Sequence, residues 1–180
     1  MHMRLMPVRF RVTEALAELD AHPELWNQYR HRSLGASPHR EVDDIWVRYN
    51  DPANLGPHFA DPHESVWYPC VEHLPGVRAI ALALKALTGA SKLGGVLITR
   101  VPAGKQVYWH ADAGWHAAAH RKFLVLLRGG ARQRFEFEGE SLETKPGECF
   151  EFENQYRHRV INDSDQERIS LIVCLRDFRD

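Results

Sequence analysis

Hydrophobic and polar residues alternate along the second half of the chain, and this alternation predicts a series of short β-strands. Side chains on a strand point to opposite faces in turn, so a period of two marks a strand with one buried face. Turn-forming pairs such as Gly129–Gly130 and Pro146–Gly147 separate these runs. The strands that we expect cover residues 96–101, 107–110, 123–127, 134–137, 141–144, 148–152, 158–161 and 168–175.

The first half of the chain has a different pattern, with two helical stretches and one strand. Residues 13–29 and 75–87 carry hydrophobic side chains at helical spacing; Pro23 restarts the first helix and Gly89 ends the second. Residues 45–50 alternate as a strand does. Helices upstream of eight short strands predict a mainly β fold: a double-stranded β-helix (jelly roll, cupin-like) with N-terminal helices packed on one outer face.

The last predicted strand, residues 168–175, is hydrophobic on both faces, as expected for a strand that is covered on each side. We expect Ile172 and Cys174 to point into the roll. The alternate positions would face the helices; they are Ile169, Leu171, Val173 and Leu175. Four aromatic residues from neighbouring strands would complete the inner wall, namely Phe135, Phe137, Phe150 and Phe152.

Composition and charge fit one ordinary folded domain. The chain has 180 residues, of which 44% are hydrophobic, and we expect a single domain over 1–180. Residues 1–94 would form the helices, an edge strand and a loop, and residues 95–180 the jelly-roll core. The net charge of −1, without blocks of like charge, argues against nucleic acid and an anionic membrane as partners.

Cysteine usage and the lack of long hydrophobic runs predict a cytoplasmic protein. Cys70, Cys149 and Cys174 form no CxxC pair and have hydrophobic neighbours, which is typical of reduced, buried thiols. No run approaches the length of a membrane span, and the first ten residues lack the hydrophobic centre of a signal peptide.

Three residues in the strand-rich half have the character of metal ligands: His110, Asp112 and His158. His110 and Asp112 are two residues apart, so both should lie on one strand face, and His158 opens a strand that can lie beside them. Two imidazoles and a carboxylate that leave half the coordination sphere open form the ligand set of non-haem Fe(II) oxygenases. Because the chain has eleven histidines, the combination carries the prediction rather than any one of them.

Arg168 and Ser170 are candidates for binding a carboxylate near that metal. Arg168 follows His158 by ten residues, and Ser170 shares its strand face together with the hydrophobic Ile172. An exposed face would be polar throughout, so Ile172 indicates that this face points inward. A guanidinium there can grip a carboxylate at two points, and the serine can add a hydroxyl donor.

The order and spacing of His110-x-Asp112, His158 and Arg168-x-Ser170 resemble the motif set of the Fe(II)- and 2-oxoglutarate-dependent oxygenases. The stretches HADAGWH and KPGECFEFENQYRHRVINDSDQERISLIV look most like the aspartyl/asparaginyl β-hydroxylase branch. The resemblance covers the C-terminal half well and the first ninety residues loosely. It implies Fe(II) on the three ligands, 2-oxoglutarate as a co-substrate held by Arg168 and Ser170, and O2 as the oxidant.

The resemblance also implies a second contact to the co-substrate. That branch often carries Arg-x-His on the strand after the HxD motif, where this chain has Arg121-Lys122-Phe123. The arginine matches and the histidine does not. We therefore expect Arg121 to contact the co-substrate, with Lys122, on the opposite strand face, as the rival candidate.

The implied activity is hydroxylation of a small carboxylate-bearing or amino-acid-like substrate, or of a peptide side chain, with release of succinate and CO2. Three residues are candidate substrate contacts: Tyr108, which shares a strand face with His110, and Arg48 and Trp67, which lie in upstream segments expected to cover the barrel mouth. The proline-rich residues 51–69 are the candidate lid.

Two other functions fit part of the pattern. A cupin-like metalloenzyme that does not use 2-oxoglutarate would keep the jelly roll and the metal but would not need the Arg168-x-Ser170 pair. A non-catalytic, ligand-binding jelly roll would not need intact ligands at all three metal positions, which this chain has. Because jelly rolls serve many functions, the fold alone does not distinguish these two functions from the oxygenase. Dependence on 2-oxoglutarate distinguishes the oxygenase from the cupin-like enzyme.

Overall fold

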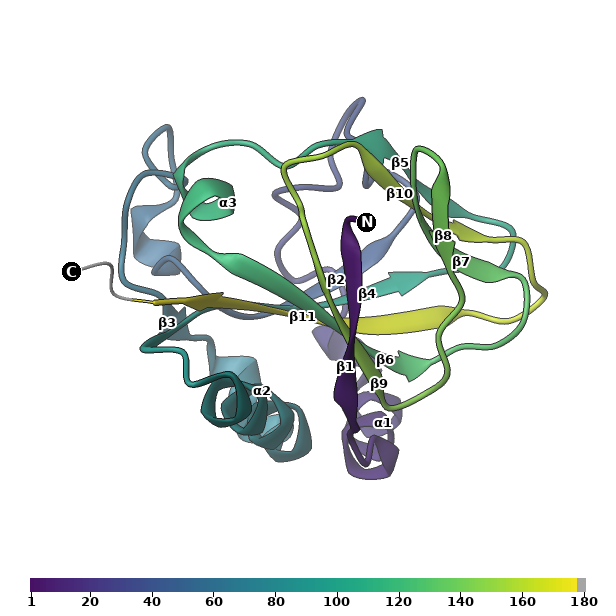
Figure 1. The fold of residues 1–180 in the computed structure, drawn as a ribbon. Helices are drawn as coiled ribbons and strands as arrows, with labels where there is room; N and C mark the ends of the chain where they lie inside the picture. Colours follow the sequence, from purple (N-terminus) through teal and green to yellow (C-terminus); the bar gives the residue numbers. More distant parts are fainter. Residues whose placement is uncertain (178–180) are drawn as a thin grey trace.

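Two antiparallel β-sheets face each other in the computed structural model, which describes residues 1–177 (Figure 1). The larger sheet has the strand order β1-β9-β6-β11-β4-β2-β3, and the smaller sheet has the order β5-β10-β7-β8. The strands are β1 (Met3–Arg9), β2 (Asp43–Tyr49), β3 (Val66–Trp67), β4 (Lys92–Val101), β5 (Gln106–His110), β6 (Arg121–Arg128), β7 (Gln133–Phe137), β8 (Glu140–Leu142), β9 (Glu148–Phe152), β10 (His158–Asn162) and β11 (Arg168–Arg176).

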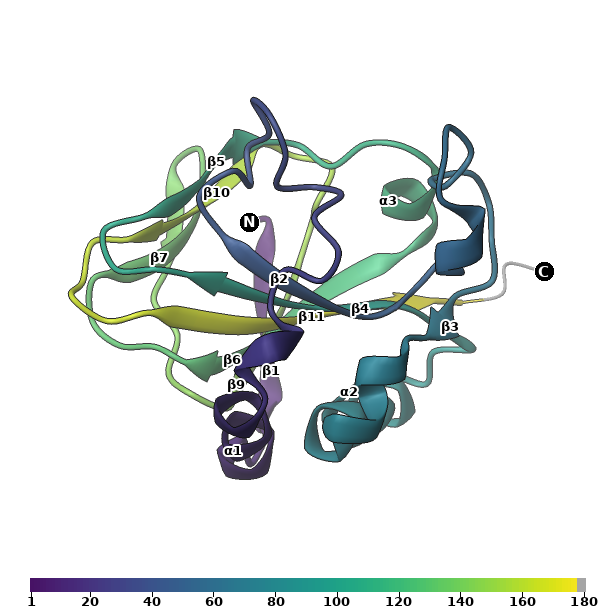
Figure 2. The same ribbon diagram turned by 180° about the vertical axis from the view of Figure 1, so that it is seen from behind.

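Two helices lie side by side beneath the larger sheet, on the face turned away from the smaller one (Figures 1 and 2). Glu18 on the first of them accepts a hydrogen bond from the backbone N–H of Gly76, at 2.7 Å, and so caps the N-terminus of the second. The helices are α1 (Thr13–Ala21), α2 (Pro75–Thr88) and α3 (Trp115–Ala119), with short 3-10 turns at Pro23–Leu25, Pro52–Asn54 and Pro69–His73.

The larger sheet separates two hydrophobic cores, as the alternation along β11 predicts. Ile169, Leu171, Val173 and Leu175 pack toward α1 and α2. Ile172 points into the space between the sheets, where it meets the aromatic wall of Phe135, Phe137, Phe150 and Phe152. The expected fold class, a jelly roll with the N-terminal helices on one outer face, is confirmed.

The N-terminal segment is more closely joined to the roll than its sequence indicates. β1 pairs with β9 at one edge of the larger sheet, and β2 pairs with β4 near the other, so residue 94 marks no structural division. The pattern of β1 is hard to read because it is an edge strand: most of its side chains are partly or fully exposed and it contains Pro7.

Burial protects the three cysteines, which are free thiols. Burial raises the pKa of Cys70 and Cys174 to about 11 and that of Cys149 to about 12, so these thiols are not nucleophilic at neutral pH. No helix within residues 1–177 has the length and apolar character needed to cross a membrane.

Candidate metal centre

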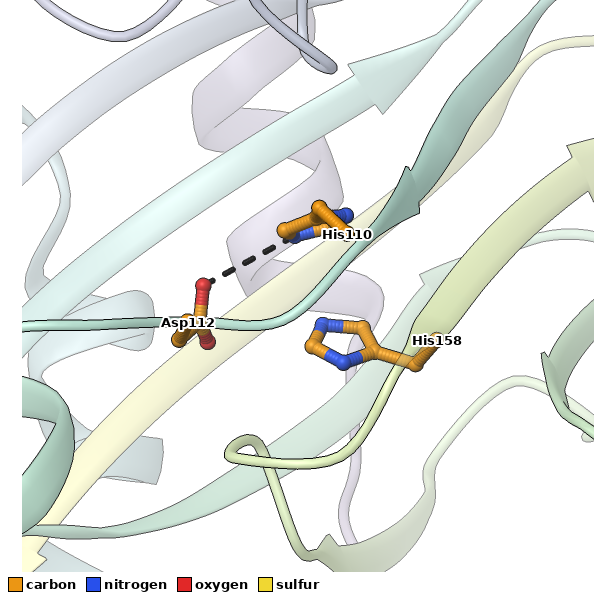
Figure 3. A group of neighbouring side chains, drawn as sticks. All are labelled: His110, Asp112 and His158. Atoms are coloured by element: carbon orange, nitrogen blue, oxygen red, sulfur yellow. Dashed lines mark ion pairs between the residues drawn. The ribbon is translucent and has the colours of Figure 1, made fainter.

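His110, Asp112 and His158 converge between the two sheets (Figure 3). His110 ends β5, Asp112 lies on the loop that follows, and His158 begins the neighbouring strand β10. One ligand atom from each residue lies within 4.8 Å of the other two, and Nε2 of His110 is 3.6 Å from Oδ1 of Asp112. The structure thus brings together the three residues that the sequence predicts as ligands.

A bulge in β5 turns His110 inward and Tyr108 outward. His158 pairs with His110 and Val160 with Val107, so β10 has one residue between these pairs and β5 has two. Val107 and His110 therefore both line the interior. The expectation that Tyr108 faces the metal is wrong, because simple alternation fails at the bulge. The Cζ atom of Arg40 instead lies over the Tyr108 ring, 3.4 Å from its centre.

Backbone carbonyls orient both imidazoles. Nδ1 of His110 lies 2.8 Å from the carbonyl oxygen of Tyr108, and Nδ1 of His158 lies 2.8 Å from that of Tyr156. A carbonyl oxygen can only accept, so each Nδ1 carries the hydrogen and each Nε2 keeps its lone pair for a metal. Burial lowers the pKa of both rings, that of His158 to about 4, so both are neutral ligands at pH 7.

Asp112 is fixed by its backbone and by a lysine. Its N–H donates to the carbonyl oxygen of Asn154 at 2.8 Å, and Nζ of Lys122 lies 2.5 Å from its Oδ2. Burial by itself would raise the pKa of Asp112, but Lys122 and the two imidazoles outweigh that effect, so its pKa is lowered. The carboxylate is therefore ionised, as a metal ligand must be.

Lys122, not Arg121, points toward the metal site. The guanidinium of Arg121 lies outside the roll, where it binds Glu151 at 2.8 Å and Asp177 at 3.3 Å. The expectation that Arg121 contacts a co-substrate is therefore corrected. Alternation along β6 puts Leu124 and Lys122 on the inner face, and both line the pocket around the three ligands.

Arg168 is completely buried and has no partner among the described residues. Its Nε, Nη1 and Nη2 are all without a hydrogen bond, although the side chain is 0% exposed. Burial lowers its pKa to about 10, so it stays charged at pH 7. Ser170, two residues along the same inner face, lines the pocket of the metal cluster. An unpaired buried charge is costly, so this arrangement suits a site that receives an anion.

Arg48 and Trp67 lie on the wrong side of the larger sheet for substrate contact. Trp46 pairs with Leu97 and Arg48 with Val96, so β2 has an extra residue between them, and this bulge turns Arg48 toward the helices. There Arg48 lies over the ring of Trp67, together with Arg78 of α2. The expectation that Arg48 and Trp67 bind substrate is corrected.

The pocket around the metal cluster is small, about 60 Å³. The loop that borders it is not residues 51–69, the candidate lid from the sequence. Arg32 and His39, on the loop of residues 26–42, line it, whereas no residue of 51–69 does. The ring of His39 is 4.6 Å from that of His110, centre to centre. A larger, open hollow of about 610 Å³ beside residues 1–4 contains none of the three ligands in its wall.

Sequence reasoning misses Arg32 and His39. One histidine among eleven and one arginine in a short basic run give no periodic signal, and the loop has no motif. In contrast, residues 51–69 pack on α3 and β2 through rings: His63 meets Trp115 at 5.3 Å, and Phe59 meets Tyr49 at 5.5 Å.

Buried histidines should make the folded protein less stable as the pH falls below about 6.5. Burial lowers the pKa of His158 to about 4 and that of His116, which is also close to His120, to about 2. The unfolded chain takes up these protons from about pH 6.5 downward, whereas the folded chain does not. Each such histidine removes roughly 1.4 kcal/mol of unfolding free energy per pH unit in that range.

Urea unfolding of the metal-free protein between about pH 7 and pH 5 measures this slope. His116→Gln keeps an acceptor for the Gly95 N–H. It should reduce the pH slope of the unfolding free energy by the contribution of one histidine, roughly 1.4 kcal/mol per pH unit. His58→Gln is the matched control because His58 has an exposed side chain, 85% accessible. An unchanged slope in His116→Gln would contradict the prediction that the folded protein keeps His116 neutral.

The fold and the site together define a class: a metal-dependent oxygenase built on the double-stranded β-helix. A family model for aspartyl/asparaginyl beta-hydroxylase matches residues 69–177, which is more than half of the chain. The chain belongs to this hydroxylase family. Fe(II), 2-oxoglutarate and O2, the expected cofactors, agree with that class. No curated protein sequence matches the chain.

Solved structures of the same fold include bacterial and animal enzymes. A 2OG-Fe(II) oxygenase family oxidoreductase from Burkholderia pseudomallei is 13% identical, with 97% of this chain and 85% of that chain covered and a TM-score of 0.66. A prolyl hydroxylase from Trichoplax adhaerens, in complex with a peptide fragment of hypoxia inducible factor, is 10% identical, with 98% and 84% covered and a TM-score of 0.66. These likenesses establish the shared fold.

Proposed function

We propose that the protein hydroxylates a small carboxylate-bearing or amino-acid-like substrate, free or within a peptide, and releases succinate and CO2. One observation carries this proposal: a fully buried arginine without an acceptor, Arg168, lies on the inner face of β11 two residues from Ser170, which lines the pocket of the three metal ligands. A metalloenzyme that used no co-substrate would have no need for a buried, unpaired guanidinium at this position. The cupin-like alternative leaves Arg168 without a role.

The three ligands fit iron. His110 and His158 present Nε2 lone pairs, Asp112 presents an ionised carboxylate, and no thiol lies among the donors. Two histidines and one carboxylate leave up to three positions of an octahedral metal open, which a bidentate co-substrate and O2 require. The hydrogen bonds from each Nδ1 to the backbone hold the rings in place before the metal arrives.

The inner face of β11 fits 2-oxoglutarate. Arg168 can bind the distal carboxylate with its two-pronged guanidinium, and Ser170 can donate its hydroxyl to the same group. The keto-acid end would then be held by a metal on His110, Asp112 and His158. Hydrophobic side chains enclose the space between, notably Leu124, Phe135 and Val160, and exclude water from the co-substrate.

Each side chain has a positioning task in the reaction. Bound iron and 2-oxoglutarate would supply the oxidising power to hydroxylate an unreactive C–H bond with O2. Asp112 is kept ionised and oriented by Lys122 and by the Asn154 carbonyl group. Phe152 and Phe135 close the pocket next to His158 with aromatic contacts of 5.6 and 5.4 Å, so the ring cannot rotate away from the metal.

Succinate release against a panel of amino acids and dipeptides tests the proposal. The iron-loaded protein should consume 2-oxoglutarate slowly alone and faster with one class of the panel, because a bound substrate couples co-substrate turnover to hydroxylation. The hydroxylated product, identified by an added mass of one oxygen atom, must match the succinate formed. A protein that loads iron but neither binds nor consumes 2-oxoglutarate would favour the cupin-like alternative.

A further inference from the structure

Arg32 is held rigidly at the edge of the metal pocket by two residues of the larger sheet. Its Nε donates to Oδ2 of Asp44 at 2.8 Å, and its Nη2 donates to Oδ1 of Asp44 at 2.8 Å and to Oγ1 of Thr99 at 2.5 Å. Thr99 in turn donates to Asp44 at 3.1 Å, and Asp44 is only 1% exposed. The guanidinium is therefore fixed in one orientation before any ligand binds.

The loop of residues 26–42, which carries Arg32, runs beside β2 and β5 (Figure 2), and its Arg32 and His39 line the pocket. Ser37 donates its hydroxyl to the Arg32 carbonyl oxygen, and the N–H of Tyr108 donates to the Pro38 carbonyl oxygen at 2.9 Å. The loop is thus tied to β2 through Arg32 and to β5 through Pro38. This places Arg32 over Thr99, which is the register partner of Ser170 on β11.

Arg32 keeps hydrogen-bonding capacity for a ligand. A guanidinium has five N–H groups, and Asp44 and Thr99 take three of them, on Nε and Nη2. Nη1 has no partner among residues 1–177, and the side chain is 25% exposed while it lines the pocket.

The other two cations near the site are already assigned. Arg168 is completely buried, and the proposed function assigns it to the distal carboxylate of 2-oxoglutarate. Lys122 is held by Asp112, with 2.5 Å between Nζ and Oδ2. Arg32 is the described cation that is both rigid and open to the pocket.

We propose that Arg32 is the residue that recognises the substrate, through a bond from Nη1 to a substrate carboxylate at the mouth of the metal pocket. This inference rests on the proposed function and names the residue that selects the acidic substrate. Asp44 and Thr99 act as positioning residues, because they lock the guanidinium and so lower the entropy cost of binding. The site would thus distinguish a carboxylate from the primary amide of the same shape, which carries no charge.

Binding of matched acid and amide pairs tests this role without turnover. The protein is loaded with Zn(II), which has no redox chemistry, and 2-oxoglutarate, and is titrated calorimetrically with blocked amino acids whose C-terminal or side-chain carboxylate is paired with its amide. In at least one pair, the wild-type protein should bind the acid about 10- to 100-fold more tightly, the worth of a hydrogen bond to a charged group. Arg32→Gln should lose this preference and bind both members with the affinity of the amide.

Three comparisons keep the result interpretable. Arg30→Gln changes an exposed arginine of the same loop and should keep the preference. The double variant Arg32→Gln/Asp44→Asn avoids an unpaired buried carboxylate and should also lose the preference, which separates recognition from misfolding. Affinity for Zn(II) and for 2-oxoglutarate should stay unchanged in Arg32→Gln.

Four outcomes would overturn the proposal. They are an acid preference that survives in Arg32→Gln, the same loss of preference in Arg30→Gln, a panel in which no acid binds more tightly than its amide, and a loss of 2-oxoglutarate affinity in Arg32→Gln. The last would make Arg32 a co-substrate residue and leave the proposed function intact. Failure of the wild-type protein to bind 2-oxoglutarate would instead overturn the proposed function.

Discussion

Alanine in place of His110, Asp112 or His158 is expected to abolish the visible absorption band that Fe(II) and 2-oxoglutarate give together without oxygen. Each residue supplies one of three donor atoms that lie within 4.8 Å of one another. Two remaining donors cannot hold the metal against water. Iron affinity should fall by more than about 100-fold, beyond the 10–100-fold typical when a residue behind a metal ligand is lost.

Anaerobic titration of each variant with Fe(II), followed by its absorption spectrum, measures this effect. His58→Ala is the matched control, because it removes a histidine that is exposed and far from the cluster in sequence. Circular dichroism confirms that each variant is folded. If all three alanine variants kept wild-type iron affinity and the absorption band, the metal centre would lie elsewhere.

Replacement of Arg168 by methionine should change stability and co-substrate binding in opposite directions. The ligand-free protein holds an unpaired guanidinium with 0% exposure, and a hydrophobic side chain of similar length removes that unpaired charge. The unfolding free energy of the metal-free protein should rise by roughly 1–4 kcal/mol. Affinity for 2-oxoglutarate should fall by about 30- to 1000-fold, because a two-point, charge-assisted contact is lost.

Two measurements separate these effects. Urea unfolding without ligands gives the change in stability, and titration of the metal-loaded protein with 2-oxoglutarate gives the change in affinity. Arg168→Lys should recover only part of the affinity, since an ammonium group cannot reproduce the two-pronged contact. A methionine variant that is both less stable and fully able to bind 2-oxoglutarate would show that Arg168 has a structural role.

Periodicity in the sequence predicts most of the roll, because regular strands keep their alternation. β9 (Glu148–Phe152) begins and ends where the pattern predicts, and the inward position of Arg168 follows from Ile172 on the same face. The three ligands are also predictable, since their chemistry and spacing act together. These predictions hold because the residues concerned keep the two-residue alternation of a regular strand.

The errors occur where the register changes or where no repeat exists. The bulges in β5 and β2 reverse the faces of Tyr108 and Arg48, and nothing in the local residue types signals an extra residue in the strand. Arg32 and His39 reach the pocket from an irregular loop, whose path is set by contacts distant in sequence, such as the bond from Tyr108 to Pro38. Only the packed structure reveals these positions.

The bulge in β5 also means that the inward position of His110 does not depend on an exact residue count before the HxD motif. Deletion of either Tyr108 or Trp109 would remove the bulge and leave one residue between Val107 and His110, so both would stay on the inner face in regular pairing with β10. The HxD motif would remain intact in such a shortened chain. Homologues that share the motif but have one residue fewer at the bulge should therefore still place the first histidine of the motif at the metal site, in an unbulged strand.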